Sequence, residues 1–213
     1  MNKKALVLLI IIIVLLLDQA LKIWVKTHFT YGESYELFGS DRAMLHFVEN
    51  DGMAFGITFG GSYGKLLLSL FRILAIAFLF FYLYELLRQK VNSWLLAGFA
   101  LIQAGALGNS IDSIFYGLIF SASPYHGGGA AEIFPAEGGY APLLYGRVVD
   151  MFYFPLFSGT YPNWFPFVGG NHFLFFKPVF NIADVAITLG VILLLGIQIS
   201  QLFKKKERPV VEE

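Results

Sequence analysis

The sequence predicts a mainly α-helical membrane protein with four transmembrane helices, organised as a single domain over residues 1–213. Hydrophobic residues make up 57% of the chain and charged residues only 14%, whereas soluble domains carry about 25% charged residues. Four apolar segments are each close to the roughly 20 residues that a helix needs to cross a bilayer. This composition argues against a soluble enzyme. Fifteen basic residues balance fifteen acidic ones, so no nucleic-acid partner is expected.

The first apolar segment has two interpretations. Lys3 and Lys4 before an apolar run are typical of a signal peptide, but no cleavage site of small residues follows. Asp18 and Lys22 continue the run at i,i+4 spacing, so we favour a retained helix. The four transmembrane helices are then expected at about residues 5–26, 65–87, 94–120 and 178–203.

Residue types within the spans predict how two of these helices are built. Pro178 suits the first turn of the fourth helix, where its missing N–H group does no harm. Small residues allow close packing between membrane helices. The third helix has such a run at Ala104, Gly105, Ala106 and Gly108.

Basic residues predict the orientation in the membrane, because cytoplasmic loops are enriched in Lys and Arg. They fall on one side of a four-span chain, which places both termini in the cytoplasm and segments 28–64 and 121–177 outside. The first outer segment alternates well enough for strands at 35–38 and 44–48, and the second contains aromatic residues that favour the bilayer surface. The basic residues are Lys3, Lys4, Arg88, Lys90, Lys204, Lys205, Lys206 and Arg208.

Charged residues inside the spans are the strongest functional signal, because each costs about 2.5–3.5 kcal/mol at a helix centre. At ~1.5 Å per residue, they all fall in the outer half of the membrane. Asn109 with Asp112, and Asn181 with Asp184, are spaced i,i+3 and share helix faces. The charged residues in the expected spans are Asp18, Lys22, Arg72, Asp112 and Asp184.

Five short motifs follow one another along nearly the whole chain. They are DQALK at 18–22, NDGMAF at 50–55, GNSID at 108–112, VVDMF at 148–152 and FNIADVAI at 180–187. In this order they resemble the lipoprotein signal peptidase family, also called signal peptidase II. Two features depart from the family pattern: Ser113 stands where an arginine is usual, and residues 121–146 look like an insertion. The segment 153–177 is also longer than usual.

The resemblance implies a fold of four transmembrane helices, a small extracytoplasmic β-cradle and a short surface helix over the active site. It implies an aspartic endopeptidase of the bacterial cytoplasmic membrane that cleaves diacylglyceryl-modified prolipoproteins just before the lipidated cysteine. Asp150 and Asp184 match the catalytic pair, and Asn50 with residues 52–61 borders the substrate cleft by the same analogy. No cofactor or metal is expected, since the four histidines form no zinc motif. The expected partners are the prolipoprotein and membrane lipids, with the chain as a monomer.

Two adjacent carboxylates suit this reaction, because they cannot both ionise at short range and so share a proton. The sequence leaves open which of the two carries it. The remaining polar residues have supporting roles as hypotheses. Asn181 orients Asp184 or the substrate, and Asn50 and Asn109 bind substrate backbone. Asp18 and Lys22 form a structural pair, and Asp112 caps or pairs at a helix end. Arg72 or Arg147 supplies the positive charge that is missing at Ser113.

Simpler interpretations stay open at this stage. Asp184 would be a buried carboxylate paired with Arg72, Asp150 a solvated loop residue, and Asn50 a turn residue. A small proton- or ion-coupled transporter would use Asp18, Asp112 and Asp184 as relay groups. The chain lacks the internal repeat common in transporters, and a structural membrane subunit would not explain Asn-x-x-Asp pairs at one depth. We therefore favour the peptidase.

Overall fold

The computed structural model describes residues 2–51, 61–89, 91–125 and 128–206. Four of its helices are long and apolar enough to cross a membrane. These helices are α1 (Lys3–His28), α2 (Gly61–Arg88), α3 (Ser93–Ile111) and α5 (Ile182–Lys206). The chain forms two compact units. We call them the helical unit (Met1–Gln19, Ser69–Ser110, Ile182–Glu213) and the sheet unit (Ala20–Leu68, Ile111–Asn181).

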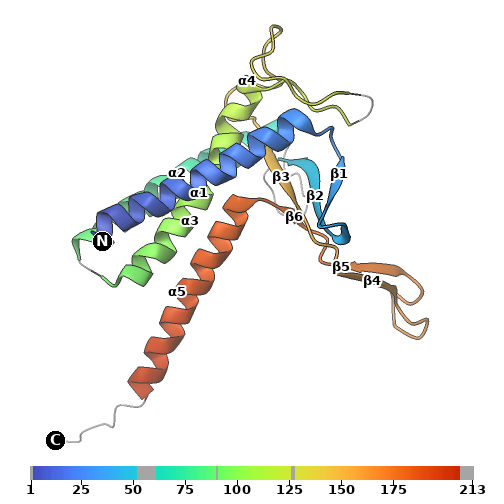
Figure 1. Ribbon diagram of the computed structural model, residues 1–213. Helices are drawn as coiled ribbons and strands as arrows, with labels where there is room; N and C mark the ends of the chain where they lie inside the picture. Colours follow the sequence, from blue (N-terminus) through green and yellow to red (C-terminus); the bar gives the residue numbers. More distant parts are fainter. Residues whose placement is uncertain (1, 52–60, 90, 126–127, 207–213) are drawn as a thin grey trace, which may run out of the picture. The chain divides into compact units, whose positions relative to one another are not determined.

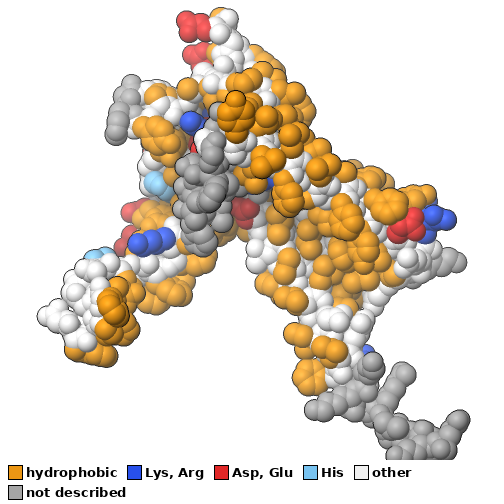
Figure 2. Space-filling model, turned by 180° about the vertical axis from the view of Figure 1, so that it is seen from behind, with side chains coloured by type: hydrophobic (Ala, Val, Ile, Leu, Met, Phe, Trp, Pro, Cys, Tyr) orange, Lys and Arg blue, Asp and Glu red, His pale blue; other side chains and the backbone are white. Residues whose placement is uncertain are grey.

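The helical unit has an apolar interior and an apolar exterior. Its buried cluster joins three helices through Val7 of α1, Leu83 and Leu86 of α2, and Leu96 and Ala100 of α3. Many large hydrophobic side chains of the same helices are exposed, and Figure 2 shows them covering most of the visible helical surface. An apolar outer surface is the expected one for helices in hydrocarbon.

Helices α3 and α5 approach each other closely within the helical unit. A Cβ atom added at Gly105 would lie 2.2 Å from the carbonyl oxygen of Ala183, and one at Gly190 would lie 2.7 Å from the carbonyl oxygen of Gly98. Only residues without a side chain permit such backbone contact. The prediction that small residues of the third helix serve close packing is therefore confirmed.

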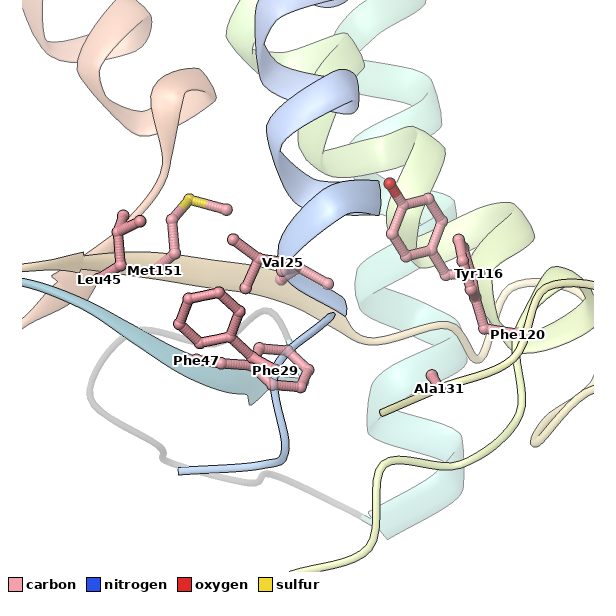
Figure 3. Close-up of a cluster of buried hydrophobic side chains, with 9 residues drawn as sticks. Val25, Phe29, Leu45, Phe47, Tyr116, Phe120, Ala131 and Met151 are labelled. Atoms are coloured by element: carbon pink, nitrogen blue, oxygen red, sulfur yellow. The ribbon is translucent and has the colours of Figure 1, made fainter. Parts of the chain in front are cut away.

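The sheet unit is built on a four-stranded antiparallel sheet with the order β1-β2-β3-β6. Its strands are β1 (Ser34–Leu37), β2 (Ser40–Asn50), β3 (Val148–Tyr153) and β6 (Val179–Phe180). Figure 3 shows the core on this sheet, where Phe47 of β2 and Met151 of β3 pack with Val25 of α1 and with Phe29, which directly follows that helix. Both strands expected at 35–38 and 44–48 are confirmed.

The segment after α3 folds back on the end of that helix. The helix continues through a π-helical turn, η2 (Asp112–Tyr116), and a last short turn, α4 (Gly117–Ile119). The returning chain then pairs with it: the N–H group of Gly146 donates to the carbonyl of Ser113 at 2.9 Å, and that of Ala141 donates to the carbonyl of Gly117 at 3.0 Å. The expected insertion at 121–146 is thus a packed part of the sheet unit over the residues described.

A second sheet of two strands forms a hairpin between β3 and β6. Its strands are β4 (Phe157–Thr160) and β5 (His172–Phe175). Figure 1 shows the hairpin extending beyond the end of the four-stranded sheet.

The fourth transmembrane helix begins later than predicted. Val179 and Phe180 form β6 and pair with β3, and α5 begins only at Ile182. The prediction that Pro178 lies in the first turn of this helix is therefore wrong. Tertiary pairing with β3 overrides the apolar pattern that suggested a longer helix.

Candidate active site

Asp150 is buried in the sheet unit and held by two asparagines. It lies in β3 and is only 4% exposed. The Nδ2 of Asn181 donates to Asp150 Oδ1 at 2.6 Å, and the Nδ2 of Asn50 donates to Asp150 Oδ2 at 3.3 Å. Asn181 also donates to the backbone carbonyl of Val149 at 3.2 Å. Each carboxylate oxygen of Asp150 therefore accepts one amide hydrogen.

Strand register explains why these side chains meet. Asp150 lies opposite Val48 in the β2–β3 pair. Successive side chains point to opposite faces of a sheet, so Asn50, two residues beyond Val48, shares the face of Asp150 as its diagonal neighbour. Asn181 comes directly after β6, which ends at Phe180 and pairs with the other edge of β3. Asp150 therefore has a hydrogen-bond donor on each side of its strand, Asn50 on one side and Asn181 on the other.

Asp184 lies in the helical unit, in the first turn of α5. The Nδ2 of Asn109, near the end of α3, donates to Asp184 Oδ1 at 2.8 Å. A carboxylate in the first turn of a helix is also favoured by the helix dipole, typically by about 0.3–1 kcal/mol. The side chain of Asp184 is partly buried.

The start of α5 is fixed by a carboxylate from α1. Asp18 Oδ1 accepts a hydrogen bond from the backbone N–H group of Ala183 at 2.8 Å, which satisfies one of the unpaired donors of the first helical turn. Gln19 donates to Asp18 Oδ2 at 3.1 Å and to the carbonyl of Gly108 at 3.2 Å. A Cβ atom at Gly108 would lie 2.7 Å from Asp18 Oδ2. We call this arrangement of α1 and α3 around the start of α5 the α5 socket.

Asp112 forms an ion pair near the end of the third membrane helix, where the sequence suggested that it caps or pairs. Its Oδ2 lies 2.9 Å from the Nζ of Lys22, and both side chains are fully buried. The same oxygen accepts a hydrogen bond from the backbone N–H group of Val149 at 3.2 Å. This ion pair therefore joins α1, η2 and β3 one residue before Asp150. The expected pair of Asp18 with Lys22 stays a prediction.

A second set of charges lies near the end of β2. Glu49 pairs with the buried Lys26 and, at 3.5 Å, with Arg147, which also lies 3.5 Å from Asp51. Burial disfavours the charge of Arg147, but the two acids outweigh it, so the pKa of Arg147 lies above its ordinary value. Tyr140 accepts a hydrogen bond from the N–H group of Arg147 at 2.6 Å, and burial raises the pKa of Tyr140 above its ordinary value.

Several of these contacts differ from what the sequence suggested. Asn181 precedes α5 instead of sharing a helix face with Asp184, and it donates to Asp150 and to the carbonyl of Val149. Asn50 and Asn109 contact Asp150 and Asp184, and their expected hydrogen bonds to substrate backbone stay predictions. The role expected of Arg72 stays a prediction. Residues 52–60, expected to border the substrate cleft, lie outside the described residues.

The pair formed by Lys26 and Glu49 was missed by sequence reasoning. Its partners lie 23 residues apart, in a helix and a strand. One signal was present: Lys26 follows Lys22 by four residues, so two lysines lie on one face of an apolar helix and each requires a buried partner.

Comparison with known proteins identifies the family. Residues 10–200 match the family model described as signal peptidase (SPase) II. The lipoprotein signal peptidase of Porphyromonas gingivalis strain W83 is 52% identical over 182 residues, which cover 85% of this chain and 77% of that protein. The lipoprotein signal peptidase of Amoebophilus asiaticus is 41% identical over 182 residues, which cover 84% and 71% of the two chains.

Two solved structures have the same fold, and both are described as bacterial membrane enzymes. The first has a TM-score of 0.60 at 23% identity and covers 96% of this chain and 93% of its own. The second has a TM-score of 0.57 at 24% identity, with 90% and 91% covered. They support four long helices with a small antiparallel sheet, and nothing found supports the transporter. The chain belongs to the lipoprotein signal peptidase (signal peptidase II) family of proteases and is a multi-pass membrane protein.

Proposed function

We propose that the protein is an aspartic endopeptidase that cleaves the signal peptide of diacylglyceryl-modified prolipoproteins just before the lipidated cysteine, with Asp150 and Asp184 as the catalytic pair. The observation that best supports this proposal is that both carboxylates accept hydrogen bonds from asparagine side chains: Asp150 from Asn50 and Asn181, Asp184 from Asn109. Amide donors stabilise a carboxylate and fix its orientation without neutralising it.

In this reaction the two carboxylates act on one water molecule. The ionised member takes a proton from the water, whose oxygen attacks the scissile carbonyl carbon, while the protonated member donates a hydrogen bond to the carbonyl oxygen. The C–N bond then breaks, and the leaving amine takes a proton from the pair. A carboxylate has about four lone-pair sites, so it can accept hydrogen bonds from amide groups and from water at the same time.

The chain connection between the two carboxylates also supports their pairing. Asn181, which donates to Asp150, precedes Asp184 by three residues. One short stretch of chain therefore provides both a hydrogen-bond donor for the first carboxylate and the second carboxylate itself.

The membrane setting follows from the substrate. Each buried CH₂ group holds a diacylglyceryl chain in the bilayer by about 0.8 kcal/mol, so cleavage must take place at the lipid surface. We place both termini in the cytoplasm and the active site at the outer leaflet of a bacterial cytoplasmic membrane, since the basic residues Lys3, Lys4, Arg88 and Lys204 lie at the opposite ends of the spans from Asp184. The enzyme works as a monomer in this scheme.

The test is cleavage of a diacylglyceryl-modified prolipoprotein by purified protein in lipid. We expect Asp150→Asn and Asp184→Asn each to abolish cleavage, while Asp41→Asn, which changes an exposed acid of β2, retains it. Unmodified prolipoprotein tests the need for the lipid. Normal cleavage by either Asp150→Asn or Asp184→Asn would overturn the assignment of the pair.

Arg147 and Arg72 remain the candidates for the positive charge that is missing at Ser113. Arg147 contacts Glu49 and Asp51, so it lies close to Asn50, the partner of Asp150. We expect Arg147→Gln to reduce cleavage more than Arg72→Gln. If both variants cleave at the parental rate, no arginine compensates for Ser113.

A further inference from the structure

The β4–β5 hairpin combines high aromatic content with a complete lack of charge. Ten of the 24 residues from Tyr153 to Phe176 are Phe, Trp or Tyr, and none is Asp, Glu, Lys or Arg. Several of these rings are exposed: Trp164 is 78% exposed and Phe167 fully so. A soluble surface of this size would carry several charges, because about a quarter of the residues in soluble domains are charged.

The hairpin is an ordered element and not a loose loop. Phe157 and Phe175 stack across the two strands with ring centroids 4.6 Å apart. Beyond the strands, the N–H group of Tyr161 donates to the carbonyl of Asn171 at 3.0 Å, and that of Gly170 donates back to the carbonyl of Tyr161 at 2.9 Å. With these backbone groups paired inside the hairpin, its tip can enter a less polar environment at lower cost.

At the tip of the hairpin, Phe167 has a strained backbone conformation. Phe167 has a φ angle of 68°, in the left-handed region that bulky residues rarely adopt. Such strain costs of the order of 1–3 kcal/mol and persists only where the surrounding structure enforces it. Here the strained residue is also the fully exposed one, so the fold holds an apolar ring outward in place of burying it.

An exposed aromatic ring does not by itself indicate an uncharged contact surface, as the β1–β2 hairpin shows. Phe38 at its turn is fully exposed and also has a positive φ angle, of 58°. Charged residues surround it in sequence, however: Glu36 two residues before, and Asp41 and Arg42 three and four residues after. Single exposed apolar residues are normal on proteins, whereas contiguous uncharged patches mark contact sites. Phe38 therefore provides a matched control within the same unit.

We propose that the tip of the β4–β5 hairpin, residues 161–171, inserts into the headgroup region of the membrane leaflet at which α5 begins. The chain passes from β6 to the transmembrane helix α5 between Phe180 and Ile182, so the sheet that carries the hairpin is covalently close to that leaflet. Trp and Tyr concentrate at this depth of a bilayer, where a ring meets both apolar and polar surroundings. With no charge at the tip, insertion depends on apolar area and not on anionic lipid.

The proposal does not depend on the catalytic assignment, since it rests only on the hairpin and on the membrane-spanning helices. The proposal gives the long 153–177 segment a use: the hairpin attaches the sheet unit to the bilayer, in addition to the chain connections between that unit and the transmembrane helices.

Tryptophan fluorescence in vesicles tests the proposal directly, because the chain has only three tryptophans. Trp24→Phe with Trp94→Phe leaves Trp164 as the single reporter in the full-length protein. The variant is reconstituted into phosphatidylcholine vesicles with lipids brominated near the headgroup. We expect these lipids to quench most of the Trp164 emission, and aqueous iodide to quench little of it. The result should be the same when anionic lipid is added and when the salt concentration is raised.

The control protein has all three tryptophans replaced by Phe and carries Phe38→Trp. Its reporter is equally exposed but lies beside charges, so we expect iodide to quench it and brominated lipid not to. Phe167→Asp in the Trp164 reporter protein should reduce quenching by lipid and increase quenching by iodide, with unchanged circular dichroism as the check on folding.

Three outcomes would overturn the proposal. Quenching of Trp164 by iodide and not by lipid would show that the tip lies in water. Shielding of Trp164 from both quenchers would show that protein covers it, as in self-association, which cross-linking would reveal. Quenching that requires anionic lipid, or that is equal at position 38, would show that the uncharged aromatic cluster does not direct the hairpin to the bilayer.

Discussion

Loss of the Asn181 side chain should reduce catalysis by an amount that the hydrogen-bond geometry predicts. Asn181 donates to Asp150 at 2.6 Å in a fully buried setting. A hydrogen bond to a charged group contributes about 1.5–3 kcal/mol, and 1.36 kcal/mol corresponds to a tenfold rate change, so Asn181→Ala should lower kcat by about 10- to 150-fold. Asn50 donates at 3.3 Å, beyond the usual range for N–H···O bonds. With a contribution of about 0.5–1.5 kcal/mol, Asn50→Ala should cost only about 2- to 12-fold.

Steady-state cleavage of a lipidated prolipoprotein, with kcat and KM determined separately, is the assay. Because the proposed function gives Asp150 a part in the chemical step, the loss should appear in kcat more than in KM. Asn171→Ala, which truncates an exposed asparagine of the β4–β5 hairpin, is the matched control and should leave kcat unchanged. A larger loss in Asn50→Ala than in Asn181→Ala, or an effect of Asn181→Ala confined to KM, would refute the proposed positioning of Asp150.

Three further predictions concern stability, each measured by unfolding of the protein in detergent or lipid. Lys22→Met leaves the buried carboxylate of Asp112 without its cation and should cost about 3–5 kcal/mol, and the double variant with Asp112→Leu should recover much of this loss. Gly105→Ala places a Cβ atom 2.2 Å from a backbone oxygen of α5 and should lower the free energy of unfolding by about 1–3 kcal/mol. Its control is Gly196→Ala, where nothing lies within 4 Å of the added atom, and this variant should leave the free energy of unfolding unchanged or raise it. Burial lowers the pKa of His46 below its ordinary value of 6.5. The unfolded state therefore binds more protons than the folded state as the pH falls below 6.5, and the free energy of unfolding should decrease there. His46→Gln should flatten this pH dependence, and an unchanged pH profile in that variant would contradict the prediction.

The transmembrane helices could be predicted from sequence because hydropathy over about 20 residues is a local property. All four expected spans are helices, and the first three match closely at both ends when η2 and α4 are counted as the continuation of α3. The fourth failed at its start, since Val179 and Phe180 are apolar enough for either a helix or a strand. The presence of β3 as a pairing partner, about 30 residues earlier, decided the outcome.

The polar residues of the candidate site were found from sequence, but their contacts were not. Asn181 and Asp184 have helical spacing, which suggested a shared face, yet Asn181 lies before the helix and contacts Asp150. Asn109 and Asp184 lie 75 residues apart, and no periodicity relates them. Sequence patterns report which residues share an element, whereas the contacts of a site arise from tertiary pairing between elements.

The α5 socket has a consequence for the order of assembly. Its two contributing helices, α1 with Asp18 and α3 with Gly108, are synthesised before α5 leaves the ribosome. A chain made from its N-terminus therefore completes the receptor for its final helix first. Asp184 reaches its position only when that helix docks, so the proposed catalytic pair is completed only once this last described membrane helix is in place.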